Sequence, residues 1–154
     1  MKAQVAWVGG ALAVVLAGIQ LVPVERTNPP VESEVAAPPA ARAVLRRACY
    51  DCHSHETRGP WYAQVAPISW LVANDVQEGR RELNCSQWQR RDARRQVKAT
   101  HDVWEHVSKG TMPPWYYTPL HPEARLSVED REALRAWRAE VTFVRATGNP
   151  GGGG

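Results

Sequence analysis

The chain has 154 residues, a length typical of one domain with short appendages. Its net charge is +3. All 16 acidic residues and all but one of the 19 basic residues follow residue 24, so the segment after residue 24 has a net charge of only +2. A nucleic-acid-binding protein is expected to be more basic, so no nucleic-acid partner is predicted. The basic run RRDARR, residues 90–95, is interpreted as a solvated helix face.

The first predicted element is a hydrophobic helix over residues 3–24 (AQVAWVGGALAVVLAGIQLVPV). This run contains no charged side chain, and Lys2 precedes it. At about 1.5 Å per residue it spans a bilayer core of roughly 30 Å. A signal peptide usually has a shorter apolar run and a small-x-small cleavage site, so residues 1–24 are predicted to be an uncleaved anchor. With Lys2 inside, the rest is expected on the periplasmic side of the inner membrane, or soluble in the periplasm if the segment is cleaved.

Residues 25–40 (ERTNPPVESEVAAPPA) are rich in proline and acidic side chains. Proline does not continue a helix, so this segment is predicted to be an extended linker or a strap along the domain. At the other end, residues 147–154 (TGNPGGGG) are predicted to form a disordered tail. A single domain, residues 41–146, is expected between the strap and the tail.

This domain is predicted to be all-α, because its apolar residues recur at helical spacing and no run alternates with the period of a strand. The apolar positions mark four helices: Val44, Leu45 and Ala48; Ile68, Leu71, Val72 and Val76; Val97, Trp104 and Val107; Leu134, Trp137, Val141 and Val144. Pro67 suits the first turn of the second helix, and Gly110 can end the third. Ser127 and Asp130 resemble a capping box at the start of the fourth helix. A long loop over residues 112–126 is expected before the last helix.

Two cysteines and a histidine lie within five positions, in the sequence CYDCH: Cys49, Cys52 and His53. A structural zinc site needs four ligands, and the remaining cysteine, Cys85, has no partner at short spacing. Four residues separate His101 from His106, a spacing that also occurs in zinc-binding histidine pairs, so a zinc site is not excluded by the sequence. A thioredoxin-like redox pair needs its cysteines at the start of a helix after a strand, and no strand is predicted before this cluster.

The third kind of site is the covalent attachment of a c-type haem, whose signature is C-x-x-C-H. Each cysteine thiol adds to one vinyl group of haem, and the adjacent histidine then offers its imidazole to the iron. Attachment takes place outside the cytoplasm, and the hydrophobic N-terminal segment supplies that route. We therefore predict one covalent haem c held by Cys49 and Cys52, with His53 as the proximal iron ligand.

Met112 is predicted to be the distal iron ligand, since it is the only methionine after the N-terminal segment. It lies in SKGTMPPWYY, where Gly110 frees the backbone while Pro113 and Pro114 stiffen the loop. A rigid loop holds a weak thioether ligand at low entropic cost. The alternative interpretation is that Met112 fills the core, which is the usual role of methionine.

The histidines are weaker candidates for the distal position. His55 lies only two residues from His53, so it is expected to face solvent or bond a haem propionate. His101 and His106 lie on the predicted third helix and remain alternative ligands. His121 is expected to support a turn or a propionate.

These motifs resemble the bacterial haem-binding domain family of small monohaem c-type cytochromes. The resemblance rests on CYDCHSHET, WYAQVAPISWLVANDVQEGRRELNCSQW, GTMPPWYYTPLHPEARLS and REALRAW, and it covers residues 7–138. It implies a cytochrome c-like fold with an N-terminal strap, thioethers at Cys49 and Cys52, and iron ligands at His53 and Met112. The sequence departs from the family at His55 and at residue 85, where an aromatic is usual and the cysteine is interpreted as a buried apolar residue.

The expected function is one-electron transfer to or from a periplasmic or membrane redox partner protein. His/Met ligation raises the reduction potential relative to harder ligands, and an iron with both axial positions filled has no site for a substrate. The alternative is a haem-based sensor or a peroxidase-like enzyme, in which Met112 leaves the iron and an arginine such as Arg58 assists peroxide or binds a propionate. A third possibility is a structural haem in a membrane-tethered interaction module. No independent acid/base pair indicates an enzyme, so a carrier is favoured over a catalyst.

Overall fold

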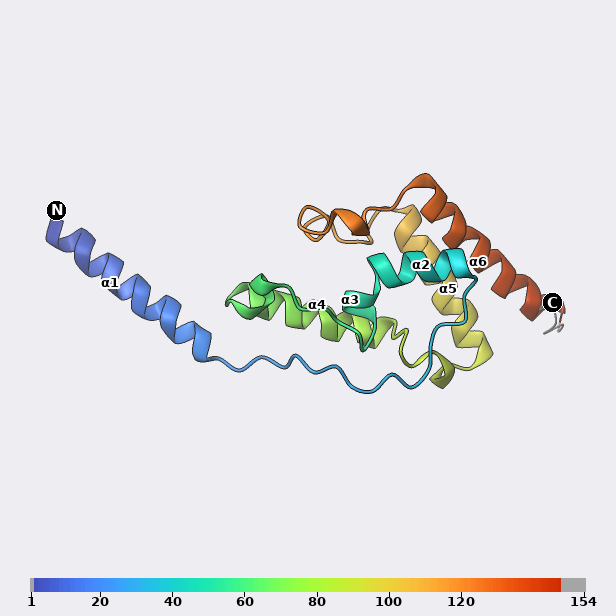
Figure 1. Cartoon of the computed structure of the whole chain (residues 1–154), viewed down its shortest axis with the longest axis horizontal. Coiled ribbons are helices and arrows are strands. Elements are labelled where there is room, and N and C mark those ends of the chain that lie inside the picture. The colour runs from blue at the N-terminus through green and yellow to red at the C-terminus, as the bar shows by residue number, and fades with distance from the viewer. Residues whose placement is uncertain (1, 148–154) are drawn as a thin grey trace.

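The computed structural model describes residues 2–147 of the chain. Within these residues the chain forms six α-helices, four short 3-10 helices and no strand, which confirms the all-α prediction. An N-terminal helix stands apart at one end of the long axis, and the C-terminal helix lies at the other end (Figure 1). The predicted tail lies outside the described residues, except for Thr147 at the end of α6.

The isolated helix is α1, Lys2–Gly18, which the 3-10 turn η1, Ile19–Leu21, continues. The segment Gln4–Leu21 is long and apolar enough to cross a membrane, and none of it is buried inside the structure. A helix that is apolar on all sides needs an apolar environment, and the domain does not supply one here. A membrane anchor and a signal sequence share these properties.

The domain is built from α2 (Pro39–Ala48), α4 (Ile68–Glu82), α5 (Ala93–Ser108) and α6 (Val128–Thr147). α6 packs against α5 and α2, whereas α4 packs against the single-turn helix α3, Tyr50–His53. The largest side chains of the core belong to Trp88 and Trp137, whose ring centroids lie 5.7 Å apart. The core therefore sits among α2, α5 and α6, and α4 lies at its margin.

The face predicted to be apolar on the helix 68–76 is not fully covered. Ile68 is 48% exposed and Leu71 is 49% exposed, whereas the buried residues of α4 are Ser69 and Gly79. The first predicted helix is α2, whose buried face includes Val44, Leu45 and Ala48 and which ends at Ala48, just before the motif; a separate turn, α3, carries Cys52 and His53.

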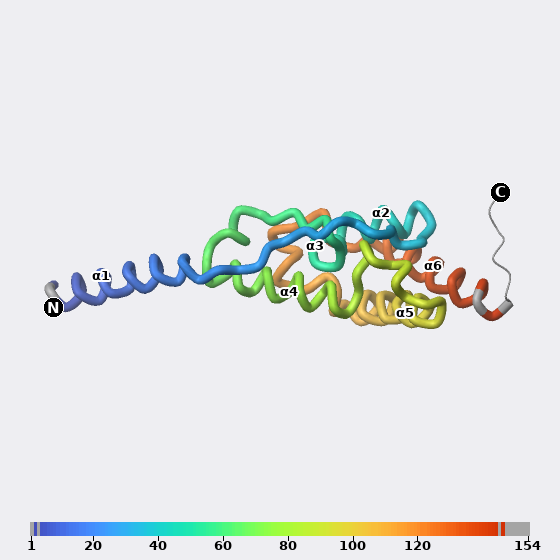
Figure 2. The backbone as a smooth tube through the Cα atoms, turned by 90° about the horizontal axis from the view of Figure 1, so that it is seen from below, coloured from blue at the N-terminus to red at the C-terminus, as the bar shows by residue number. Residues whose placement is uncertain are grey.

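An extended segment joins η1 to α2 and runs along the domain as a strap (Figure 2). The backbone N–H groups of Glu32 and Ser33 both donate to the carbonyl of Ser86. Further along, the indole Nε1–H of Trp137 donates to the carbonyl of Ala36 over 2.9 Å. These bonds attach the strap both to the segment after α4 and to α6.

Candidate functional site

The CxxCH motif forms one turn that begins at Cys49, directly after α2, and continues through α3. Cys49 interrupts the helix with φ −124° and ψ −30°, and Cys52 and His53 belong to α3. The backbone N–H groups of Cys52 and His53 donate to the carbonyl of Cys49 over 3.2 and 2.9 Å. These local bonds hold the two cysteines and the histidine in one compact unit.

Both thiols of the motif are free and partly buried. Burial raises the pKa of Cys49 to about 12, and burial together with the carboxylates of Asp75 and Asp51 raises the pKa of Cys52 to about 12. A thioredoxin-like pair relies on a thiol of low pKa that is a thiolate at neutral pH. The thiols are protonated here, so the structure does not support a redox pair.

His53 is held by two backbone carbonyls near the end of α4. Its Nδ1 lies 2.8 Å from the oxygen of Gly79 and 3.1 Å from the oxygen of Leu83. Because both partners can only accept, Nδ1 carries the proton and Nε2 keeps its lone pair. Burial lowers the pKa of His53 against the opposing effect of the two carbonyls, so the ring is neutral at neutral pH. An imidazole fixed in this way is prepared to bind a metal through Nε2.

Gly79 allows α4 to approach the motif. A Cβ atom at this position would lie 2.6 Å from the carbonyl oxygen of Cys52, which is closer than non-bonded atoms come. Only glycine therefore lets the carbonyl of residue 79 reach His53. The sequence analysis missed this role, although a glycine inside a helical pattern, which costs about 1 kcal/mol relative to alanine, was an available signal.

Arg80, the next residue, clamps the strap over the segment that follows the motif. Its guanidinium donates to the carbonyl oxygens of Ser54 and Thr27, over 2.8 and 2.7 Å. It also donates to Oδ1 of Asn28 and Oγ1 of Thr57, over 2.7 and 3.0 Å. Arg80 therefore joins α4, the strap and the segment after His53, a role that sequence spacing did not reveal.

Met112 lies in the loop that follows α5. Gly110 has φ 68° just after this helix, and the N–H groups of Thr111 and Met112 donate to the carbonyl of His106 over 3.0 and 3.4 Å. The Met112 side chain is 38% exposed, so it does not fill the core. Its thioether is thus available to a ligand at the surface of the described chain.

Two tyrosines fasten the Met112 loop to the side of the motif. The hydroxyl of Tyr117 donates to Oδ2 of Asp51, between the two cysteines, over 2.7 Å, and Tyr116 donates to Oδ2 of Asp75 on α4 over 3.1 Å. Burial, and then Asp51, raise the pKa of Tyr117 well above its ordinary value, so its hydroxyl remains a donor. Segments that are far apart in the sequence are thereby brought to one part of the molecule.

His121 supports this loop, which is one of the roles predicted for it. Its ring stacks on Tyr117 with centroids 3.9 Å apart and planes 8° apart. Its Nε2 lies 2.5 Å from the hydroxyl of Tyr62, and its Nδ1 lies 3.0 Å from a carboxylate oxygen of Glu123. The stack fixes the end of the loop opposite to Met112.

His55 is buried, so the prediction of a solvent-facing ring is wrong. Its Nδ1 lies 2.8 Å from the carbonyl of Pro30 on the strap, and its Nε2 lies 2.8 Å from Nδ2 of Asn84. Cys85 is buried, as predicted, and its N–H donates to the carbonyl of His53 over 2.7 Å. The strap covers this side of the motif, and such a long-range contact leaves no local signal in the sequence.

His106 and Arg58 remain at the surface. The Nδ1 of His106 lies 2.9 Å from Oγ1 of Thr111 in the Met112 loop. The backbone N–H of Arg58 donates to Oδ1 of Asp51 over 3.1 Å, while the Arg58 residue itself is exposed. His106 thus contacts the backbone and side chain that lead into Met112.

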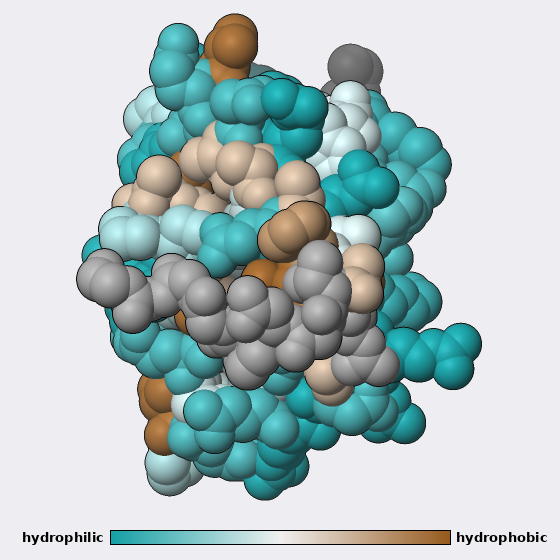
Figure 3. Space-filling view, turned by 90° about the vertical axis from the view of Figure 1, so that its right-hand side faces the viewer, coloured by the Kyte–Doolittle hydropathy of each residue, from teal (hydrophilic) through white to brown (hydrophobic). Residues whose placement is uncertain are grey.

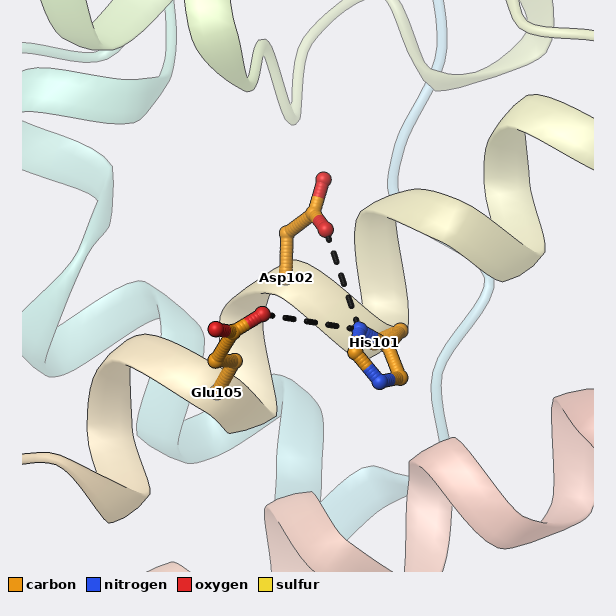
Figure 4. Close-up of side chains that lie close together, drawn as sticks. All are labelled: His101, Asp102 and Glu105. Atoms are coloured by element: carbon orange, nitrogen blue, oxygen red, sulfur yellow. Dashed lines mark ion pairs between the residues drawn. The ribbon is translucent and has the colours of Figure 1, made fainter.

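One group of three potential metal ligands occurs among residues 2–147, and it lies on α5: His101, Asp102 and Glu105 (Figure 4). The Nδ1 of His101 lies 3.8 Å from an oxygen of each carboxylate. The same carboxylates pair with Lys98 and Lys109 over 2.5 Å. No cysteine takes part, so within the described chain the motif gains no support as a zinc site.

Apolar and aromatic side chains near the motif are partly exposed. Leu71 lies one helical turn before Asp75, and Tyr116, the partner of Asp75, is 42% exposed. The motif offers two free thiols and a neutral imidazole whose Nε2 has no hydrogen-bond partner within the described residues, and two tyrosines of the Met112 loop are bonded to Asp51 in the motif and Asp75 on α4. These groups form a donor set that suits an iron-containing cofactor.

The helical fold and this donor set together define a haem-type binding domain. The model of one protein family, described as the haem-binding domain, matches residues 14–140. The match covers most of the chain, so the chain belongs to the haem-binding domain family. Comparisons with curated proteins and with solved structures gave no match.

Proposed function

We propose that the chain is a monohaem c-type cytochrome that carries single electrons at the periplasmic face of the inner membrane. The observation that carries this proposal is the placement of His53, whose Nδ1–H is bonded to two carbonyls beside two protonated thiols. When bound, haem supplies a couple between ferric and ferrous iron that accepts and releases one electron. Side chains of the chain would attach the haem and supply the ligands of its iron.

Cys49 and Cys52 attach the group covalently. Each S–H would add across one vinyl double bond of haem, with sulfur joined to one carbon and hydrogen to the other, so that no oxidant would be needed. Both thiols are free in the structure, so neither is held in a disulfide that would first have to be reduced. His53 would bind the iron through Nε2, and the carbonyls of Gly79 and Leu83, which accept from Nδ1, would raise the basicity of the imidazole.

Met112 is the distal ligand in this proposal. A thioether ligand would favour ferrous iron and raise the reduction potential, and an iron bound by both His53 and Met112 would leave no site for a substrate. Tyr116 and Tyr117 hold the loop against α4 and the motif, which limits its movement between the two redox states. The haem-bearing domain then serves as a carrier for a periplasmic or membrane redox partner. Retention of α1 would confine the search for that partner to the membrane surface.

Optical spectra of the full chain, made with cytochrome c maturation machinery, test this function. The wild type is expected to be low-spin when oxidised and when reduced, with a charge-transfer band from methionine to ferric iron. Met112→Ala is expected to lose that band. Leu120→Ala is the matched control, because Leu120 is an apolar residue of the same loop that is 66% exposed, and it should keep the band.

A high-spin wild type would contradict the role of Met112, as would a Met112→Ala variant with an unchanged spectrum. Either result favours the sensor or peroxidase-like enzyme, in which the sixth position is open or easily vacated. A chain that acquires no covalent haem would contradict the roles of Cys49 and Cys52.

A further inference from the structure

An uncharged stretch of the domain lies beside the N-terminal helix. Residues 59–74 contain no acidic, basic or histidine side chain. They form η2 (Trp61–Gln64), the turn after it and the first half of α4. Figure 1 shows this end of the domain, in green, as the part nearest to α1. Trp61 is 80% exposed and Val65 is 45% exposed.

Gln20 fastens this end of the domain to the end of the hydrophobic segment. Its Nε2 donates to the carbonyl of Ala66 over 3.2 Å, and its Oε1 accepts from the N–H of Ala66 over 2.9 Å. The reciprocal pair fixes the turn after η2 at the level where Gln4–Leu21 ends. Leu21 is 85% exposed at the same level, so apolar side chains from two segments share one end of the molecule.

The opposite end of the molecule has a different surface. Viewed from the side of the C-terminus, the visible surface is largely hydrophilic, and its apolar residues form small separate patches (Figure 3). Exposed tryptophan beside uncharged apolar residues is the composition of a membrane–water interface, where the ring lies at the level of the headgroups. The exposed side chains of residues 61–67 lie next to the apolar end of α1 and η1. A bilayer that surrounds α1 is therefore the surface expected to contact them.

We infer that the η2 end of the domain, residues 61–67, lies in the headgroup region of the bilayer that α1 spans. Trp61 and Val65 contact the boundary between headgroups and acyl chains. Arg26, which is exposed and donates to Oε1 of Gln64 over 2.6 Å, is placed at the rim to meet lipid phosphates. The contact fixes the height and orientation of the haem-binding motif above the membrane. This inference rests on retention of α1 as an anchor, which is part of the proposed function.

Two tryptophans of nearly equal exposure provide the test. Trp61 is 80% exposed, and Trp115 is 82% exposed in the loop between α5 and η4 (Pro122–Ala124), which lies farther from α1 (Figure 1). The full chain, with Trp61→p-benzoylphenylalanine or Trp115→p-benzoylphenylalanine, is placed in bilayers of phosphatidylethanolamine and phosphatidylglycerol. After irradiation, phospholipid adducts are quantified by mass spectrometry. Position 61 is expected to give at least about fivefold more adduct than position 115.

Extraction with alkaline carbonate separates this inference from the anchor. If the chain stays in the membrane and positions 61 and 115 give equal yields, the lipid contact is overturned and the anchor stands. If carbonate releases the chain, the anchor is overturned and the lipid contact with it.

A second variant tests the link through Gln20. Gln20→Ala, combined with the probe at position 61, is expected to lower the adduct yield towards that of position 115. Gln89→Ala, a change of an exposed glutamine in η3 (Trp88–Arg90), is the control and should leave the yield unchanged. Equal yields in the two variants would overturn the role of Gln20 in holding this face against the bilayer.

Discussion

The two sides of the candidate haem site are held in different ways. On the proximal side, the motif is closed by its own backbone, and His53 is bonded to two carbonyls of a helix that Gly79 brings into contact. On the distal side, Met112 is 38% exposed in a loop that is fastened by the hydroxyls of Tyr116 and Tyr117. The proposed proximal ligand, His53, is therefore held inside the fold, whereas the position of the proposed distal ligand, Met112, depends on hydrogen bonds at the margin of its loop.

This difference predicts which substitutions in the site will have the larger effects. Steric conflict in a packed contact usually costs more than the loss of one peripheral hydrogen bond. Changes on the proximal side should therefore impair both stability and haem attachment. Changes in the distal loop should mainly alter the sixth ligand while the haem stays covalently bound.

The largest effect is expected for Gly79→Ala. The added Cβ would lie 2.6 Å from the carbonyl oxygen of Cys52, so α4 must move and the contact of His53 with the carbonyl of Gly79 is disturbed. We expect a loss of about 1–3 kcal/mol in the free energy of unfolding, measured by chemical denaturation, and a marked fall in covalent haem. Gly59→Ala is the control, because its Cβ would lie 3.7 Å from Nε2 of Gln64, an ordinary contact. Equal stability and haem content in the two variants would show that the close approach is not needed.

The next effect concerns the strap that covers the proximal side. Trp137→Phe removes the bond from Nε1 to the carbonyl of Ala36. Trp88→Phe is its matched control, because Trp88 is equally buried and its Nε1 has no hydrogen-bond partner within the described residues. Trp137→Phe should lower the free energy of unfolding by about 1 kcal/mol more than the control. Thermal or denaturant unfolding measures this difference, and an equal loss in both would contradict a stabilising strap contact.

A smaller effect is expected in the distal loop. Tyr117→Phe removes the partly buried bond to Asp51, and the free energy of unfolding should fall by about 0.5–1.5 kcal/mol. The intensity of the methionine-to-iron band should fall as well, while the covalent haem content stays constant. Tyr116→Phe removes a more exposed bond to Asp75 and should change both quantities less. If Tyr117→Phe lost covalent haem as well, the separation between the two sides would be wrong.

The smallest effect lies away from the site, where Arg47 of α2 pairs with Asp130 of α6 over 2.7 Å. Partial burial alone would raise the pKa of Asp130, but Arg47 and the N–H of Ser127 outweigh it and hold that pKa below its ordinary value. The resulting stability is present above the unfolded pKa of about 3.9 and is lost as the pH falls through the folded value. Asp130→Asn should flatten this acid dependence and cost less than about 1 kcal/mol at pH 7, as measured by unfolding at several pH values. An unchanged acid dependence in this variant and in Arg47→Gln would contradict the pairing.

The helical framework was largely predictable because its signals are local. Ser127 and Asp130 exchange the two hydrogen bonds of a capping box, over 2.9 and 3.1 Å. Gly110 adopts a positive φ just after α5, as expected for a residue that ends a helix. The CxxCH motif is equally local, since its spacing is visible in the sequence.

The contacts that complete the site are not local, and the sequence alone did not indicate them. Gly79 meets Cys52 across two helices, and no spacing rule relates these residues. His55 was expected at the surface, but Pro30 of the strap covers it. The pattern on α4 predicted a core-facing Leu71, which is half exposed because the described chain does not cover it. Periodicity identifies an apolar face, but it does not say what that face contacts.

The most direct test of the central claim is the intact mass of the full chain after cytochrome c maturation and denaturation. The wild type is expected to keep the mass of one haem, and the double variant Cys49→Ala/Cys52→Ala is expected to keep none. If haem separates from the denatured wild type, or if the double variant still carries it, covalent attachment through this motif is contradicted.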